Sequence, residues 1–346
     1  MTDADLTPPQ RRDLKTVLRK LGPWLIAAVV LYFVFQKVSI TDVTRSVRHA
    51  DLRIFLPLLL FNLLIIFLWE SQVYTLLFRW FHVPVSYREM LPVRGASYML
   101  AVLNFFAGQG GVALIMNRWK GLSLKRGGSI ILFAAFNDYY LLLAFCLAGA
   151  FRLPGVDLVS FFESSREGSL VRFIVISWML FGLHLSFYRL YLPRPQAQLR
   201  FKRQEIFSTF REAPVTLYFK LMAVRSVTFV AGILTCYFAL TAFGLHVPLR
   251  YLAVFLPIVW LISSIPITVM GLGTTQAAMI WLVARFAEGS GGPEEITAAV
   301  LAYSLLWWFL FNLGRFSIGA FCLFRLPKHI WLSQRAESRP HDSGTV

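Results

Sequence analysis

The stretch Gly271-Leu272-Gly273-Thr274-Thr275-Gln276 interrupts a long apolar segment, where hydrocarbon tails would be expected around a membrane protein. A second cluster, Gly108-Gln109-Gly110-Gly111, interrupts an earlier apolar segment. Each follows a Leu-Pro step, at Leu256-Pro257 and at Leu91-Pro92, and the proline precedes the first glycine by 14 and 16 residues. Hydrophobic segments that glycine interrupts at corresponding positions of two halves point to a transporter binding site. The clusters therefore predict an internal repeat with a glycine turn in each half.

The composition is typical of a polytopic membrane protein. Hydrophobic residues make up 57% of the chain and charged residues only 15%, with a mean hydropathy of +0.62, outside the range of soluble domains. The net charge is +16. The Lys and Arg residues lie mainly in loops and tails beside apolar spans, where they set orientation and contact anionic headgroups. We therefore expect membrane lipids, including anionic phospholipids, as partners, and no nucleic acid.

The sequence offers little support for a cofactor or for catalysis. Cys146, Cys236 and Cys322 fall inside apolar spans without C-x-x-C spacing, so neither disulfides nor a zinc site are indicated. The glycine clusters lack the G-x-x-x-x-G-K-[ST] spacing of a nucleotide-binding loop. No catalytic Ser/His/Asp set is visible. We expect no metal, no cofactor and no catalytic residue, and keep a lipid-modifying enzyme as the alternative.

Several apolar stretches are long enough to cross about 30 Å of hydrocarbon at 1.5 Å per residue. Basic residues precede the first stretch, but no small-x-small cleavage site follows it, which favours an uncleaved anchor helix over a signal peptide. Two further stretches, 88–112 and 251–284, carry the glycine clusters and could be full crossings or hairpins. The six predicted spans are 21–38, 54–81, 128–151, 171–191, 215–243 and 296–325.

The charge of the flanking loops decides whether the two glycine-bearing stretches are full crossings or hairpins. Both chain tails and the loops 113–127 and 193–214 are rich in Lys and Arg, which predicts a cytoplasmic location. The loops 152–170 and 285–295 have low basic content and fit the outside. If the basic segment 79–94, with Arg79, Arg88 and Arg94, is cytoplasmic like 113–127, the first glycine-bearing stretch between them must enter and return on the cytoplasmic side. The second must enter and return from the outside.

The predicted fold class is all-α: a polytopic membrane helical bundle of about six full spans plus two opposed re-entrant helical hairpins in an inverted repeat. We expect a basic cytoplasmic tail at 1–20 and a single transmembrane domain at 21–325, with repeat halves at about 54–151 and 215–325. A disordered cytoplasmic tail follows at 326–346. Protein or water must surround such hairpins, because each unsatisfied backbone group in hydrocarbon costs several kcal/mol. Alternatively, the glycines only let helices pack closely or kink.

Charged residues inside the spans are the candidates for a site. Asp138 and Arg225 each lie about ten residues into a span from the cytoplasmic side, near the midplane. We predict an ion pair between them across the repeat interface, or a joint contact with a ligand. A static pair that only fixes helix register is the alternative. Glu70 and Arg94 could neutralise each other, and Arg315 is expected to extend to the headgroups.

After each glycine turn a helix is expected to restart near mid-membrane, with free N–H groups that could receive an anion such as a lipid phosphate. Thr274 and Thr275 are N-cap candidates there. The amides of Gln109 and Gln276 could bond a ligand, although bonding to a neighbouring helix is the commoner use. Tryptophans such as Trp307-Trp308 are expected at the membrane interface.

Taken together, these residues resemble the lysylphosphatidylglycerol synthase transmembrane family, also described as flippase-like integral membrane proteins. The likeness covers about 20–325 and rests on three motifs. They are a Gly-x-Gly-Gly turn with a helix and basic loop from Gly108 to Gly121, an Asp within the next span at Asp138, and a Gly-Leu-Gly turn with a helix from Met270 to Ala278.

The resemblance implies a bacterial inner-membrane protein with cytoplasmic termini that moves a lipid or lipid-linked glycan between leaflets. Several charged cavity residues of the family are neutral here, at Val112, Ile115, Thr275-Gln276, Tyr139 and Ser304, which leaves room for a larger, less charged lipid. The alternative functions are a membrane-embedded lipid-modifying enzyme and an accessory subunit of a lipid or envelope biosynthesis complex. The alternative protein partners are a second copy of the chain, in a homo-oligomer, and a biosynthetic enzyme. The candidate substrate-binding residues are Asp138, Arg225, Glu70, Arg94, Gly108, Gln109, Gly110, Gly111, Gly271, Gly273, Thr274, Thr275, Gln276, Tyr139 and Tyr303.

Overall fold

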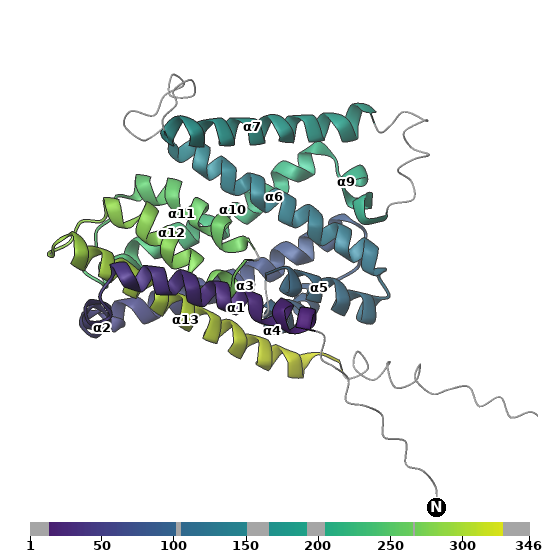
Figure 1. Ribbon diagram of the computed structural model, residues 1–346. Helices are drawn as coiled ribbons and strands as arrows, with labels where there is room; N and C mark the ends of the chain where they lie inside the picture. Colours follow the sequence, from purple (N-terminus) through teal and green to yellow (C-terminus); the bar gives the residue numbers. More distant parts are fainter. Residues whose placement is uncertain (1–13, 102–104, 151–165, 192–204, 266, 328–346) are drawn as a thin grey trace, which may run out of the picture.

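The computed structural model describes residues 14–101, 105–150, 166–191, 205–265 and 267–327 (Figure 1). Within them every regular element is a helix, and an isolated β-bridge joins His246 to Glu288. The elements are α1 (Leu14–Lys37), α2 (Ile40–His49), α3 (Leu52–Trp80), α4 (Tyr87–Ala101), α5 (Phe105–Lys120), α6 (Leu124–Ala150), α7 (Arg166–Ser186), η2 (Phe187–Tyr191), η3 (Glu205–Phe207), α9 (Ser208–Glu212), α10 (Val215–Thr241), α11 (Leu249–Ser264), η4 (Val269–Gly271), α12 (Thr274–Leu282), η5 (Ala284–Phe286) and α13 (Pro293–Arg325).

Four helices of the described chain, α3, α6, α10 and α13, are long and apolar enough to cross a membrane. They coincide with four of the six predicted spans and establish a helical membrane bundle. α1 and α2 form a pair bent by 88°, which would add a fifth span if the pair were one. The stretch 171–191 is helical, as α7 and η2, but is not among the four. Crossings at 21–38 and 171–191 therefore stay predictions.

The first glycine cluster is helical, so the predicted turn at Gly108–Gly111 is wrong. The whole cluster lies inside α5. A Cβ added at Gly108 would lie 2.5 Å from the Cβ and 2.9 Å from the Cα of Ala101, and one at Gly111 would lie 2.7 Å from a Leu100 methyl carbon. Residues three apart share a helix face. These two glycines therefore let α5 pack closely against α4, as the alternative interpretation held.

α4 and α5 form an antiparallel pair that is closed at its base. Gly108 faces Ala101 at one end, while at the other Lys120 Nζ lies 2.5 Å from Glu89 Oε1. The Lys120 ammonium, together with the Ser86 N–H that donates to Glu89 Oε2 at 2.7 Å, lowers the pKa of Glu89 to about 2. This carboxylate stays ionised near neutral pH. Its stabilising contribution is complete above the ordinary pKa of 4.5 and is lost as the pH falls from there through about 2.

The second glycine cluster is the non-helical break that the sequence predicts. Between α11 and α12, Met270, Gly271 and Gly273 have φ angles of +51°, +74° and +85°. Glycine adopts this region freely, whereas a side chain such as that of Met270 is strained there. Trp308 Nε1 donates to the Met270 carbonyl at 3.0 Å and so holds the strained residue in place.

The second helical pair is also closed at its base. His246 precedes α11 and Glu288 follows α12, and the two residues exchange both backbone hydrogen bonds at 2.8 Å. At the break, a Cβ added at Gly271 would lie 3.1 Å from the Ser263 Cβ on α11, so the two arms approach closely here as well. In each glycine-bearing segment, the beginning of the first helix and the end of the second helix therefore lie close together.

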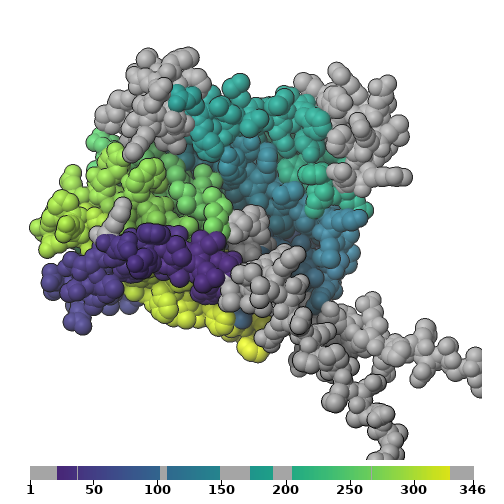
Figure 2. All heavy atoms as spheres, viewed as in Figure 1, coloured from purple at the N-terminus to yellow at the C-terminus, as the bar shows by residue number. Residues whose placement is uncertain are grey.

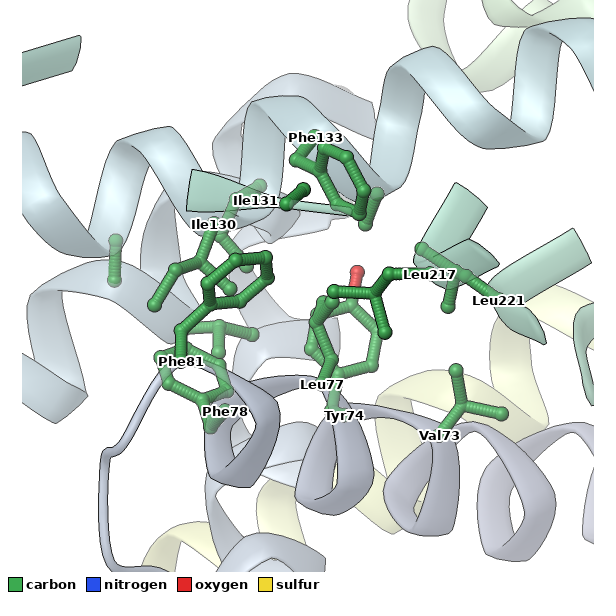
Figure 3. Close-up of a cluster of buried hydrophobic side chains, with 14 of the residues drawn as sticks. Val73, Tyr74, Leu77, Phe78, Phe81, Ile130, Ile131, Phe133, Leu217 and Leu221 are labelled. Atoms are coloured by element: carbon green, nitrogen blue, oxygen red, sulfur yellow. The ribbon is translucent and has the colours of Figure 1, made fainter. Parts of the chain in front are cut away.

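The helices of the two predicted halves pack in corresponding pairs. α3, the first helix of one half, packs against α10, the first helix of the other. The contact between α4 and α13 corresponds to the contact between α11 and α6. The contacts α4–α5 and α5–α6 likewise match α11–α12 and α12–α13. α3 and α10 run in opposite directions: Leu77, late in α3, lies near Leu217 and Leu221 at the start of α10 (Figure 3), whereas Phe55, early in α3, shares a cluster with Ile233 from the later part of α10.

α1 and α2 cover one face of this arrangement. In the space-filling view they form a purple band between the green second hairpin and the yellow α13 (Figure 2), in agreement with the packing of α1 on α12 and of α2 on α13. α2 buries Val43 and exposes Arg45 and Arg48. This division of apolar and basic faces is typical of a helix at a membrane surface.

Gly108 provides a test of the close packing between α4 and α5. We expect Gly108→Ala to destabilise the protein by about 1–3 kcal/mol, because the new methyl group overlaps the backbone of Ala101. Gly110→Ala is the control, since a Cβ there meets nothing within 4 Å and alanine favours a helix by about 0.5–1 kcal/mol. Thermal unfolding of the purified protein measures both variants. Equal unfolding temperatures for the two would contradict the packing role.

Candidate functional site

A cavity of about 560 Å³ lies between the two predicted halves. α3, α6, α10 and α13 line it together with residues from both glycine-bearing segments, Gln109 of the first and Thr275 of the second. Its volume falls in the range of small-molecule sites. Of the residues predicted for substrate binding, the cavity wall includes Glu70, Gln109, Asp138, Tyr139, Arg225, Thr275 and Tyr303.

The predicted ion pair between Asp138 and Arg225 is present. Arg225 Nε and Nη2 donate to the two carboxylate oxygens of Asp138, which joins α10 to α6. Arg225 is 5% exposed and Asp138 15% exposed, so neither charge has free access to water. Two parallel charge-assisted bonds fix the relative orientation of the two side chains.

The second pair, Glu70 with Arg94, forms as well. Arg94 Nε lies 3.0 Å from Glu70 Oε2, and Nη2 donates to the same oxygen. Arg94 Nη1 also donates to Ser97 Oγ at 3.4 Å. Glu70 belongs to the cavity wall, whereas Arg94, 4% exposed, lies behind it on α4. The pair therefore connects the first hairpin to α3.

Tyr74 lies between the two ion pairs. The guanidinium carbons of Arg94 and Arg225 lie 4.8 and 5.8 Å from the centroid of its ring, and its hydroxyl donates to Gln109 Oε1. Both distances are within the range of cation–π attraction. Tyr74 was not among the site residues predicted from the sequence. The available signal was its position four residues after Glu70, which places both on one face of α3.

The second turn organises its own neighbourhood through side-chain hydrogen bonds. The predicted N-caps are wrong: Gly273 caps α12, and Gln276 Oε1 accepts from its N–H at 2.7 Å. Thr274 is the first helical residue and donates to the Gly271 carbonyl at 3.1 Å. Thr275 Oγ1 lies 2.7 Å from Ser263 Oγ across the hairpin. Of these threonines, only Thr275 belongs to the cavity wall.

Some of the remaining predicted residues line the cavity, and the others lie outside its wall. Tyr139 and Tyr303 line the cavity, and the Tyr139 hydroxyl lies 3.3 Å from Ser177 Oγ. Gln276 is fully buried, and its Nε2 lies 3.4 Å from the Ser304 carbonyl, so it bonds within the protein. The other predicted residues are outside the cavity wall: Arg94, Gly108, Gly110, Gly111, Gly271, Gly273, Thr274 and Gln276.

Two expectations about residues at the membrane interface are wrong. Trp307 and Trp308 line the cavity, as does Arg315, which was expected to reach the headgroups. The Arg315 guanidinium stacks 4.5 Å from the centroid of Tyr98, and its Nε is buried. Counting residues along α13 gives depth, but it does not give the direction in which a side chain points. The aromatic part of the wall consists of Tyr139, Phe229, Trp260, Tyr303, Trp307, Trp308 and Phe311.

The described residues contain no group of three or more His, Cys, Asp or Glu side chains that could hold a metal ion. The residues that line the cavity supply charge pairs, amides and aromatic rings. This combination suits the binding of a polar group that carries an apolar body.

The Asp138–Arg225 pair predicts different effects of single and double neutralisation. Arg225→Gln should destabilise the protein by about 3–5 kcal/mol, because it leaves a buried carboxylate without its partner. Asp138→Asn combined with Arg225→Gln should recover most of that loss. Arg45→Gln, at an exposed pair with Asp42, is the control and should stay within about 0.5 kcal/mol. An Arg225→Gln variant as stable as the control in thermal unfolding would contradict the pair's structural role.

The comparison with protein families agrees with this architecture. The family model described as the lysylphosphatidylglycerol synthase TM region matches residues 21–314. The match covers both glycine-bearing segments, all of α3, α6 and α10, and α13 as far as residue 314. No curated protein and no solved structure matched the chain. The chain is a multi-pass membrane protein and belongs to the lysylphosphatidylglycerol synthase transmembrane family.

Proposed function

We propose that the protein binds a lipid headgroup in the cavity and passes it between the leaflets of the bacterial inner membrane, as a flippase-like transporter of a lipid or lipid-linked glycan. The observation that carries this proposal is the pairing of charges inside apolar helices around a cavity of about 560 Å³. Ionisable residues within membrane spans generally mark pathways for polar substrates.

The depth of the charges supports a path for a headgroup. Asp138 lies roughly 14 residues from the start of α6 and Arg225 roughly ten from the start of α10, or about 21 and 15 Å by helical rise. Both distances fall within a hydrocarbon core about 30 Å thick. A headgroup that reached these residues would be far from either aqueous phase, while its acyl chains could stay in lipid.

The corresponding packing pairs support an inverted repeat. α3, α4, α5 and α6 make the same set of neighbours as α10, α11, α12 and α13, and the first helices of the two sets run in opposite directions. We infer six spans, with α1 and α7 crossing beside these two halves, and both chain termini in the cytoplasm. The substrate site of such transporters lies at the repeat interface, which is the position of the cavity.

The dimensions of the hairpins support re-entry from one side. α4 has 15 residues and α11 has 16, or about 22 and 24 Å, less than the hydrocarbon thickness. Both segments are closed at the base, by Lys120–Glu89 in the first and by the His246–Glu288 bridge in the second. If the two hairpins enter the membrane from opposite sides, the cavity between them could open to one leaflet and then to the other.

Single cysteines at the hairpin bases test the topology in a variant without the three native cysteines. Arg88→Cys and Lys125→Cys, at exposed positions, flank the first hairpin and should react with an impermeant maleimide only from the cytoplasmic side. Arg250→Cys and Glu288→Cys flank the second and should react only from the outside. If the two cysteines that flank one hairpin react from opposite sides, that segment crosses the membrane and the re-entrant arrangement is wrong.

Lipid transfer can be measured with the protein in liposomes that contain a fluorescent phospholipid, with dithionite bleaching the outer leaflet. We expect transfer to slow by roughly tenfold or more in the Asp138→Asn/Arg225→Gln variant, since charge-assisted hydrogen bonds contribute about 1.5–3 kcal/mol. An Asp42→Asn/Arg45→Gln variant serves as the control at an exposed pair. Transfer no faster than in protein-free liposomes, across anionic, zwitterionic and glycan-linked lipids, would refute transport.

A further inference from the structure

An open groove of about 440 Å³ lies on the outer face of α3. Its wall consists of residues from α3 and one from the start of α4: Phe61, Leu64, Ile65, Leu68, Trp69, Gln72 and Tyr87. None of these seven lines the cavity between the two predicted halves. The α3 residues that do line the cavity, Asn62, Ile66 and Glu70, are spaced four apart and belong to the adjacent face of the helix. α3 therefore separates the groove from the cavity.

The apolar part of the groove faces the surrounding lipid. Phe61, Leu64 and Leu68 are 56%, 42% and 44% exposed, and α3 is one of the helices apolar enough to span the membrane. Phe61 and Gln72 are eleven residues apart, or about 16 Å by helical rise. That length is close to half of a hydrocarbon core about 30 Å thick, which is the share of one leaflet. The groove therefore matches one acyl chain in length and polarity.

The other end of the groove contains three side chains that can form hydrogen bonds. Two of them bond within the protein: Trp69 Nε1 donates to the Val224 carbonyl at 2.7 Å, and the Tyr87 hydroxyl donates to the Leu68 carbonyl at 3.2 Å. These bonds hold both rings in the groove wall. The half-buried Gln72 amide has no hydrogen-bond partner in the described part of the chain. Its two N–H groups need an acceptor from outside the protein, because an unpaired amide in apolar surroundings is costly.

We propose that the groove binds one acyl chain of a glycerophospholipid of the cytoplasmic leaflet, whose ester carbonyl accepts a hydrogen bond from Gln72 Nε2. In the predicted topology α3 runs from the outside to the cytoplasm, so Gln72 lies towards the cytoplasmic end. Tryptophan and tyrosine, here Trp69 and Tyr87, are typical of the polar boundary of a membrane. The groove recognises the linkage between glycerol and chain, and not the headgroup. Binding there does not require transport through the cavity.

Ester and ether lipids with the same headgroup isolate the hydrogen bond to Gln72. The dialkyl ether counterpart of dipalmitoyl phosphatidylcholine lacks the carbonyl oxygens and is otherwise matched. Because the groove is open along α3, its lipid exchanges with the surroundings, and native mass spectrometry of the full-length protein measures binding of added lipid. We expect the ester lipid to bind about three- to tenfold more tightly, as for one neutral hydrogen bond. Gln72→Leu should abolish this preference. Equal affinities in the unmodified protein, or the same preference in Gln72→Leu, would overturn the proposal.

A larger side chain in the apolar part tests the groove itself. Leu64→Trp should take the place of the acyl chain and weaken binding of both lipids roughly tenfold or more, since the displaced CH₂ groups lose their apolar contacts. Leu56→Trp is the matched control, because Leu56 lies on the same helix and is 44% exposed but is not part of the groove wall. The unfolding temperature without added lipid checks that both variants fold. Undiminished lipid binding by folded Leu64→Trp would contradict the assignment.

Photocrosslinking identifies the occupant without a substitution. The full-length protein is placed in liposomes with phosphatidylcholine that carries a diazirine in one acyl chain. Adducts should be more frequent at residues 61–72 than on a comparably exposed part of α13, which includes Phe309, Leu313 and Phe316. Adducts no more frequent at 61–72 than on α13 would show ordinary lipid contact and overturn the proposal. Disulfide-linked dimers of Phe61→Cys in the same liposomes would assign the groove to a second copy of the chain and would also overturn it.

The groove and the cavity can fail separately. Asp138→Asn/Arg225→Gln alters the cavity and should leave the preference for the ester lipid unchanged. Loss of that preference in this variant would place the bound chain in the cavity and refute the groove assignment. If the unmodified protein prefers the ester lipid but transfers no lipid between leaflets, the proposed transport is refuted and the groove assignment stands.

Discussion

Burial of charge in an apolar bundle is the constraint on which this structure depends. Asp138 and Glu70 cannot remain ionised among apolar helices without partners, and Arg225 and Arg94 supply them across helix boundaries. The pairs join α6 to α10 and α3 to α4, so helices from different parts of the sequence are held in one register. Tyr74 contacts both guanidinium groups and Gln109, which extends the connection to α5.

Features that depend only on position along a helix or along the chain were predictable from the sequence. Helical rise is fixed, so counting residues placed Asp138 level with Arg225, and the two form the predicted pair. The suggested neutralisation of Glu70 by Arg94 is also present. The break at Gly271–Gly273 was also predictable, since two closely spaced glycines and a following polar run are typical of a turn with positive φ. The family match over residues 21–314 confirms the resemblance that these motifs carried.

The predictions that were wrong depend on how a helix is rotated against its neighbours. Gly108 and Gly111 have the spacing of one helix face, and only the position of Ala101 reveals that they serve close packing within a continuous helix. Arg315, Trp307 and Trp308 were assigned by depth alone, and their direction depends on the rotation of α13 against its neighbours. Tertiary packing sets this rotation, and the spacing of residues along a single sequence does not reveal it. The two glycine clusters thus look alike in sequence and differ in conformation.

The claim that the cavity holds a lipid headgroup through its paired charges is tested most directly by the lipids that co-purify with the protein. Native mass spectrometry of the full chain extracted from membranes should detect a retained lipid with a polar headgroup. The Asp138→Asn/Arg225→Gln variant, prepared in the same way and folded, should have lost it. The same retained lipid at the same occupancy in both proteins would contradict the account.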